Sequence, residues 1–244
     1  MSPAAAPLLP SELELLDVIA TGHGLAPLDR ALLLARAGGA REPELLPVGE
    51  RDRVILGLRT ALLGAGLEAT DCCPACGEKA AFSLNSRTLA APGPKAAAIR
   101  LEQYGFVLVC RPPTSQDLRR AADAGPRSAR NVLLAAIIES ATLDGEPIAV
   151  AALPAGAIAE AGRLLSEADP LADIQVQLEC LSCGSEWSTA LDISDFAWRE
   201  LQHWSRRVLW EVHTLARAYG WAEAEVLAVP PHRRHVYLEW VTNG

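Results

Sequence analysis

Two short cysteine motifs that lie far apart in the chain constrain its fold more than any other feature. Residues 71–77 read DCCPACG and residues 179–185 read ECLSCGS, so each stretch contains a Cys-X-X-Cys-Gly unit. Four of the six cysteines in this 244-residue chain stand in these two units. Paired Cys-X-X-Cys units are typical of four-thiolate metal sites, so we expect both to reach one ion. The chain must then return, after a long insertion, to the place that it left.

The pattern predicts a structural zinc site whose ligands are Cys73, Cys76, Cys180 and Cys183. Zinc prefers four tetrahedral ligands, and two thiolates in one tight turn supply half of them. The glycine after each pair lets the backbone turn back and direct its amides toward the sulfurs. We expect each motif in the turn of a β-hairpin, and the two hairpins as a zinc ribbon split by the insertion. One Zn2+ per chain would contribute free energy of folding directly.

Two other interpretations of the cysteines remain open, namely a thioredoxin-like redox pair and no bound metal. A redox centre needs only one pair, and neither pair precedes an evident helix in a βαβ unit. Cys72 could replace Cys73 as a ligand, although the Cys-Pro-Ala-Cys-Gly turn favours Cys73. Cys110 stands in an apolar strand, where we expect an inert core thiol.

Composition narrows the class of protein and its compartment. No apolar run approaches the roughly 18 to 20 residues of a membrane-spanning helix, so we expect a soluble protein without a membrane partner. The first residues lack the basic and apolar parts of a secretory signal, which favours the cytoplasm. Paired cysteines in such a reducing compartment are more often metal ligands or redox centres than disulfides. The net charge of −8 makes nucleic acid an unlikely principal partner, because phosphate binding requires a basic surface.

Helical patterns dominate both ends of the chain, and strand patterns surround the cysteines. Ser11 and Glu14 fit a capping box before the first helix, and Thr114 with Asp117 fits another. Alternation of apolar and polar residues is cleanest at 174–180. Helices are expected at about 12–22, 27–37, 50–64, 128–140, 154–167, 194–219 and 221–229, with a further helix that begins at Thr114 and a strand at 104–113.

The expected fold class is therefore α+β and mainly α. Helical N- and C-terminal parts would surround the split zinc ribbon, which carries an inserted α/β segment. We divide the chain into an N-terminal helical segment (1–68), the split ribbon with its insertion (69–192) and C-terminal helices (193–244). These parts are expected to form one integrated unit.

Sequence motifs of the common enzyme classes are missing from the chain. The five histidines include no HExxH pair, and the sequence contains no GxSxG, P-loop or GxGxxG fingerprint. We therefore expect no catalytic residues, no enzymatic activity and no small-molecule substrate.

Six motifs, in this order, resemble a known family: GERDRVILGLRTALLG, CPACGEKAAFSL, RPPTSQDL, CLSCGSEW, DISDFAWREL and LARAYGWAEAEVLAVPPHRRHVYLEWV. The chain resembles, from about residue 24 to its end, the baseplate hub assembly chaperones of T-even-type contractile phage tails. Versions of this family also lie in gene clusters for phage-tail-like contractile injection systems. The resemblance implies a non-enzymatic protein that assembles or completes a baseplate, with baseplate or hub proteins as partners.

An alternative function is that of a zinc-ribbon transcription regulator with a C-terminal helix-turn-helix. Its basic contacts would come from Arg206, Arg207, Arg233 and Arg234. The acidic balance of the whole chain disfavours this alternative.

The long C-terminal helix also predicts a partner surface. Its main apolar stripe is explained by core packing, whereas Phe196 and Trp210 fall on the other side, in line with Arg217. These three residues are the candidate partner contacts, because Trp and Arg are enriched where few residues carry most of the binding energy. Coverage of the two aromatics by other parts of the same chain is the alternative.

Overall fold

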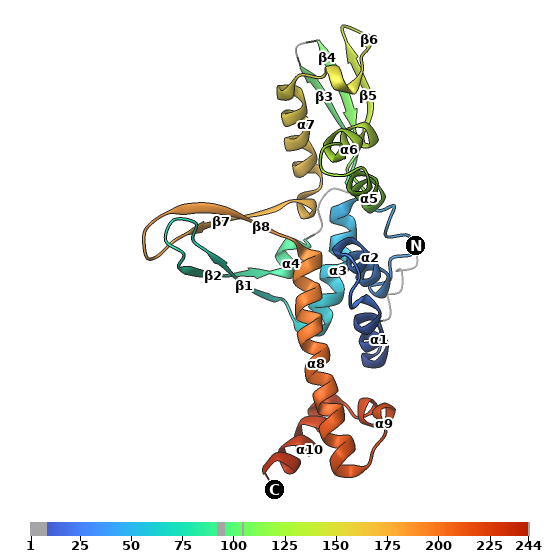
Figure 1. The fold of residues 1–244 in the computed structure, drawn as a ribbon, viewed down its shortest axis with the longest axis vertical. Helices are drawn as coiled ribbons and strands as arrows, with labels where there is room; N and C mark the ends of the chain where they lie inside the picture. Colours follow the sequence, from blue (N-terminus) through green and yellow to red (C-terminus); the bar gives the residue numbers. More distant parts are fainter. Residues whose placement is uncertain (1–8, 92–95, 104, 244) are drawn as a thin grey trace.

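The computed structural model describes residues 9–91, 96–103 and 105–243. A helical body occupies the middle of the elongated molecule, with a mixed module at one end, a pair of β-hairpins projecting from the side and two small helices at the other end (Figure 1). The mixed, mainly helical class is confirmed. The body consists of α1 (Glu12–Gly22), α2 (Pro27–Ala37), α3 (Val48–Leu63) and the first half of α8 (Ile193–Tyr219).

Helix α8 is the longest element and organises the body. The Asp192 side chain accepts a hydrogen bond from the Asp195 amide at 3.0 Å and caps its first turn. Its last turn ends at Gly220, whose φ of 72° suits the left-handed conformation of a helix C-terminus. Between these ends, apolar residues at steps of three and four give one buried stripe that packs on α1, α2 and α3: Trp198, Leu201, Trp204 and Val208.

Trp198 lies at the centre of this core and is only 1% exposed. Gly22 at the end of α1 makes room for it, since a Cβ atom on Gly22 would lie 2.2 Å from the indole ring. The Arg30 guanidinium covers the ring at 5.2 Å from its centroid, a cation–π distance. One tryptophan therefore fixes how α1, α2 and α8 meet.

Buried arginines join helices that are distant in sequence. Arg59 of α3 pairs with Glu200 of α8 at 2.7 Å. Arg234, in α10 (Pro231–Asn243), is 1% exposed and pairs with Glu12 of α1 at 2.6 Å and with Glu211 of α8 at 3.0 Å. The C-terminal helix is therefore tied to the first helix of the chain. Helix α9 (Glu223–Ala228) completes this end, where Leu215, Val226 and Leu238 form a small core.

Two antiparallel hairpins leave the body side by side, as the alternation of residues predicts (Figure 1). Within the described part of the chain, no strand of one hairpin pairs with a strand of the other. Both hairpins are followed at once by a helix, which is the single turn α4 (Ser86–Leu89) after the first and α8 after the second. The first hairpin is β1 (Gly66–Cys72) with β2 (Lys79–Asn85), and the second is β7 (Ile174–Glu179) with β8 (Glu186–Leu191).

The segment between the hairpins forms a module with a core of its own. Its antiparallel sheet has the strand order β3-β4-β5-β6, and helix α7 packs on it through Ala157 and Ala161. The strands are β3 (Ile99–Gln103), β4 (Phe106–Cys110), β5 (Ile138–Leu143) and β6 (Glu146–Pro147). The helices are α5 (Ser115–Asp123), α6 (Ala129–Ile137), the short η1 (Val150–Ala152), α7 (Ala155–Ala168) and the short η2 (Pro170–Ala172).

The expectation of a helix over 128–140 is wrong at its C-terminal end. Helix α6 stops at Ile137, and β5 begins at the next residue because the chain pairs there with β4. The amide of Arg111 donates to the Ile137 carbonyl at 2.9 Å, which extends this pairing into the end of the helix. The expected strand at 104–113 is shorter as well, since β4 covers 106–110, and Tyr104 lies outside the described residues.

The three expected segments do not correspond to three cores. Residues of α2 and α3 share one core with residues of α8, so the N-terminal segment (1–68) and the C-terminal segment (193–244) pack together. The inserted module has a separate core that includes Leu101, Leu108 and Cys110. Residues 1–8 of the first segment and Gly244 of the last lie outside the described part of the chain.

The inserted module is attached to the body through the first turn of α3. The Gly49 amide donates to Asp169 Oδ2 at 2.9 Å, and this carboxylate is buried. A Cβ atom on Gly49 would lie 1.9 Å from Asp169 Oδ1, so only glycine fits here. Arg51 of the same turn donates to the hydroxyl of Ser115 in α5 at 2.8 Å, which adds a second contact to the module.

We predict that Gly49→Ala destabilises this junction by about 1–3 kcal/mol, because the added methyl group displaces a buried, hydrogen-bonded carboxylate. Urea denaturation followed by circular dichroism measures the loss. Gly57→Ala is the matched control in the same helix: its Cβ would meet nothing within 4 Å, so it should stabilise α3 by up to about 1 kcal/mol. Equal stability of the Gly49→Ala protein and the unmodified chain would contradict the junction described here.

Candidate metal centre

Each cysteine pair lies in a tight turn at the tip of its hairpin, and the two turns share one hydrogen-bond pattern. In the first, the Cys73 amide donates to the Glu78 carbonyl at 2.8 Å, and the Gly77 amide donates to the Cys73 carbonyl at 2.9 Å. Gly77 has a φ of 76°, which a residue with a side chain rarely adopts. This conformation returns the chain toward β2 with both thiols on the same side of the turn.

The second turn repeats this geometry. The Cys180 amide donates to the Ser185 carbonyl at 2.9 Å, the Gly184 amide donates to the Cys180 carbonyl at 2.8 Å, and Gly184 has a φ of 71°. The likeness extends beyond the turns, because each hairpin ends in a residue that caps the next helix. These residues are Asn85 before α4 and Asp192 before α8.

The four predicted ligands come together. Cys73 Sγ lies 3.7 Å from Cys183 Sγ, Cys76 Sγ lies 3.5 Å from Cys180 Sγ, and all four sulfurs lie within 4.8 Å of one another. These separations are far longer than the roughly 2.05 Å of a disulfide bond. Each hairpin contributes one buried and one exposed cysteine. The group could bind a metal ion that contacts all four sulfurs and thus joins the two hairpins.

Backbone amides in both turns favour the thiolate form of the cysteines. The amides of Cys183 and Ser182 donate to the Cys180 sulfur and lower the pKa of that thiol to about 7. The Glu78 amide acts in the same direction at Cys76, but hydrogen bonds with Cys180 and other thiols outweigh it and raise the pKa of Cys76 to about 12. Four thiolates at such distances repel one another, so a cation is required to hold them all deprotonated.

A hydrogen bond beside the cysteines also joins the two hairpins. The indole Nε1–H of Trp187 in β8 donates to Asp71 Oδ2 in β1 at 3.0 Å. Hydrogen bonds from Trp187, from the Thr189 side chain and from the Cys72 amide lower the pKa of Asp71 below its usual value. Between the two hairpins, the Asp71 carboxylate thus accepts hydrogen bonds from Trp187 and Thr189 of β8.

The hairpins bury too little apolar surface to hold their arrangement alone. In all four strands, half-buried residues alternate with exposed ones, so each hairpin has one mainly apolar face and one face exposed to solvent. Leu67 is the only strand residue of the two hairpins that is fully buried, and it lies at the base, next to the body. An isolated two-stranded hairpin is marginally stable in water. A cross-link at the tips would replace the missing core.

The other two cysteines, Cys72 and Cys110, lie outside the four-sulfur group. Cys72 is exposed and outside the four-sulfur group, so Cys73 is the ligand candidate. Cys110 is buried in the module core, and burial is the main reason why the pKa of its thiol is raised. Neither residue belongs to a second cluster of metal-binding side chains in the described part of the chain.

The three candidate partner residues fall in different environments. Phe196 is 8% exposed and packs in the core between α8 and the N-terminal helices, so its assignment to a partner surface is wrong. The reason is that the start of α8 is covered both by the N-terminal helices and by the hairpin base, whereas the hairpins do not reach its second half, which packs on α9 and α10. Trp210 is 53% exposed, and Arg217 is exposed on the same helix.

Comparison with models of known protein families, with curated proteins and with solved structures finds no match to this chain. Every helix in the described residues is too short or too polar to cross a lipid bilayer.

Proposed function

We propose that the four cysteines hold one structural Zn2+ ion. Two sulfurs bound to the same tetrahedral zinc at about 2.3 Å each are about 3.8 Å apart. The Sγ separations of 3.5 and 3.7 Å between the hairpins come close to this value. A site of four protein thiolates leaves no open position for substrate or water, which is the pattern of a structural rather than a catalytic zinc.

We further propose that the protein is a zinc-stabilised assembly chaperone or minor baseplate component of a contractile phage-tail-like injection system. The resemblance in the order of six motifs supports the system, and an exposed aromatic surface supports a binding role. That surface is the second half of α8, where Trp210 is 53% and Leu209 48% exposed. This single observation carries the binding role, because tryptophan is enriched among the few residues that contribute most of the energy of a protein interface.

The charges around Trp210 indicate the kind of partner. Arg206, His213 and Arg217 are exposed on the same helix, and neither arginine forms an ion pair with a described residue. The chain as a whole carries a net charge of −8, so this basic region stands out from its own protein. It suits an acidic protein surface, which steers association without requiring a large interface.

The substitution Trp210→Ala tests the partner surface. The side chain is exposed, so the melting temperature should stay within about 2 °C of that of the unmodified chain. Co-purification with the baseplate partner should fall at least tenfold, because a central tryptophan contributes about 2 kcal/mol or more to binding. Arg163→Ala, on the exposed face of α7, is the control and should leave binding unchanged. A Trp210→Ala protein that melts normally and binds fully would remove Trp210 from the interface.

Deletion of the gene tests the biological role. Sheath and tube proteins should still be expressed, while few complete particles should be visible by electron microscopy. A plasmid copy of the unmodified gene should restore particle numbers. Normal particle numbers in the deletion strain would contradict the assembly role but not the zinc site.

The alternative of a DNA-binding helix-turn-helix has less support. Arg234, one of its four basic residues, is buried between Glu12 and Glu211 and unavailable to phosphate. The exposed side of α10 also carries Glu239, which would face a phosphate backbone unfavourably.

A further inference from the structure

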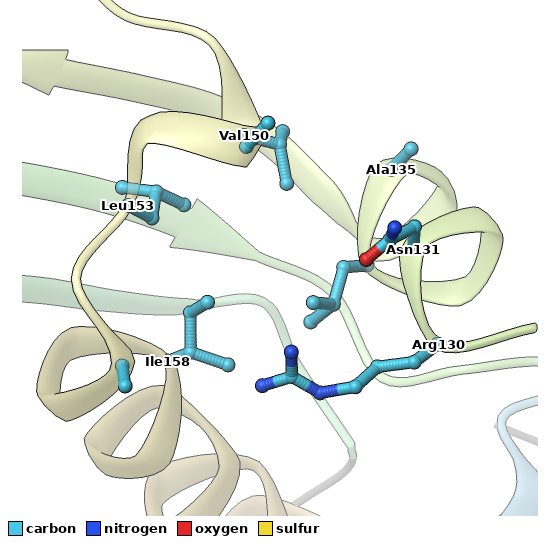
Figure 2. A pocket seen from close by; sticks show the side chains of 9 residues that line it. Arg130, Asn131, Ala135, Val150, Leu153 and Ile158 are labelled. Atoms are coloured by element: carbon cyan, nitrogen blue, oxygen red, sulfur yellow. The ribbon is translucent and has the colours of Figure 1, made fainter. Parts of the chain in front are cut away.

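The inserted module contains a cavity that the proposed zinc site and partner surface do not use. It lies between α6, η1 and the start of α7 and has a volume of about 370 Å³ (Figure 2). This volume falls within the range of about 300–1,000 Å³ that is usual for ligand sites. The module that holds it lies at the end of the molecule farthest from α10 (Figure 1).

The wall of the cavity is mainly apolar. Val150 and Leu153 reach it from η1 and the residue that follows, and Ile158 reaches it from the first turns of α7 (Figure 2). Small side chains at Ala135, Ala151 and Ala155 keep the space open. An aliphatic group of a ligand would therefore find apolar contacts on three sides.

One cation reaches into this apolar space. Figure 2 shows the Arg130 side chain extending from α6 across the cavity toward Ile158. Arg130 forms no ion pair or side-chain hydrogen bond with a described residue, and no carboxylate lines the cavity. Two other arginines of the module are instead paired, Arg111 with Asp117 and Arg163 with Glu160. Arg130 thus retains all of its donors for a ligand.

Two further polar features lie on the same side of the cavity. Asn131 presents a side-chain amide, which can donate to and accept from a peptide group (Figure 2). Arg130 and Asn131 also belong to the first turn of α6, which has no side-chain cap. The partial positive charge of an uncapped helix start adds to the attraction of the guanidinium for an anion.

We propose that this cavity binds the C-terminus of a protein partner that ends in an aliphatic residue. The last side chain would lie against Leu153 and Ile158, the terminal carboxylate would pair with Arg130, and Asn131 would hydrogen-bond the preceding peptide group. Guanidinium groups bind carboxylates through two parallel hydrogen bonds. A single cation in an apolar cavity suits one carboxylate, whereas a nucleic acid or an anionic membrane would require several exposed cations.

This site is independent of the proposed baseplate role, and its ligand can be tested with purified components. The probe is a fluorescein-labelled hexapeptide, Gly-Ser-Gly-Ala-Val-Leu, titrated with the full-length protein in an anisotropy assay. A second copy of the peptide carries a C-terminal amide, and a third ends in Asp. Octanoate is tested as a competitor, because it joins a carboxylate to an aliphatic chain without a peptide group.

We expect saturable binding of the Leu-ending peptide and at least tenfold weaker binding of the amidated and Asp-ending peptides. Arg130→Ala should reduce affinity at least tenfold and Ile158→Asp should abolish binding. Arg127→Ala, an exposed arginine outside the cavity, should have no effect. Arg130 is exposed and Ile158 is half-buried, so both variants should fold, and circular dichroism verifies that they do.

Three results would overturn the proposal. The first is no binding of the free-acid peptide at about 1 mM protein, a concentration at which a site with a Kd of about 1 mM would still be detected. The second is equal affinity for the acid and the amide, which would remove Arg130 from recognition. The third is tight octanoate binding without peptide binding, which would make the site one for small amphiphiles.

Discussion

The Cys180→Ser variant is expected to bind no metal and to lose the ordered arrangement of both hairpins. Structural zinc contributes about 10–16 kcal/mol to folding in small zinc-finger peptides, which matches or exceeds the whole stability of an ordinary domain. Here the hairpins bury little apolar surface apart from their base, so they have little else to hold them together. Hydrogen–deuterium exchange should rise by orders of magnitude in residues 66–85 and 174–191, and trypsin should cut this region.

The body of the same variant should keep its helices. Its core lies between α8 and the N-terminal helices and does not include the hairpin tips, so far-UV circular dichroism should retain most of its helical signal. Cys72→Ser is the matched control, because Cys72 is exposed, adjacent to a ligand and outside the four-sulfur group. Should Cys180→Ser show the same exchange rates as Cys72→Ser, the metal would not be the clamp of the hairpins.

Trp198→Ala should cause the largest loss of stability of any single substitution in the body. The side chain is 1% exposed and is held between Gly22 of α1 and Arg30 of α2, so its removal leaves a cavity shared by three helices. Substitutions of this kind cost about 3–5 kcal/mol in unfolding free energy. Urea denaturation at about 25 °C measures this value. The midpoint of unfolding should fall while the slope of the transition does not increase.

Trp210→Ala supplies the comparison for Trp198→Ala, since both remove a tryptophan from the same helix. Trp210→Ala should change the unfolding free energy by about 0.5 kcal/mol or less, as substitutions at exposed positions generally do. A cost below about 1 kcal/mol for Trp198→Ala would contradict the packing described for the body.

The cysteine site was predictable because its signal is local. Each Cys-X-X-Cys-Gly unit specifies its own turn, and alternation at 174–178 specifies the strand before it. What the sequence could not supply is the second link between the hairpins. Asp71 and Trp187 stand next to the motifs, but their hydrogen bond depends on how the two ribbons face each other. Asp71, a charged residue on the half-buried side of β1, was the available signal.

The inserted sheet was harder to predict because its pairing is not local. β5 follows α6 without a break, and the apolar residues Ile137 and Ile138 fit the end of a helix as well as the start of a strand. Pairing with β4 decides between the two, and this pairing is a tertiary interaction. β3 has only five residues and pairs antiparallel with β4, so its sequence pattern is too short to identify.

Phe196 shows the same limit on a helix. Helical periodicity separates Phe196 from the main apolar stripe, but it does not reveal how many neighbours the helix has. The start of α8 lies against both the N-terminal helices and the hairpin base, and its second half lies against α10. The same side of α8 is therefore buried at Phe196 and exposed at Trp210.

We expect one zinc ion to join the two hairpins through Cys73, Cys76, Cys180 and Cys183. The most direct test is native mass spectrometry of the protein, purified without chelator, together with elemental analysis of the same sample. We predict one zinc per chain in the unmodified protein and in Cys72→Ser, and none in Cys180→Ser. A folded, unmodified protein with no bound metal would contradict the zinc site.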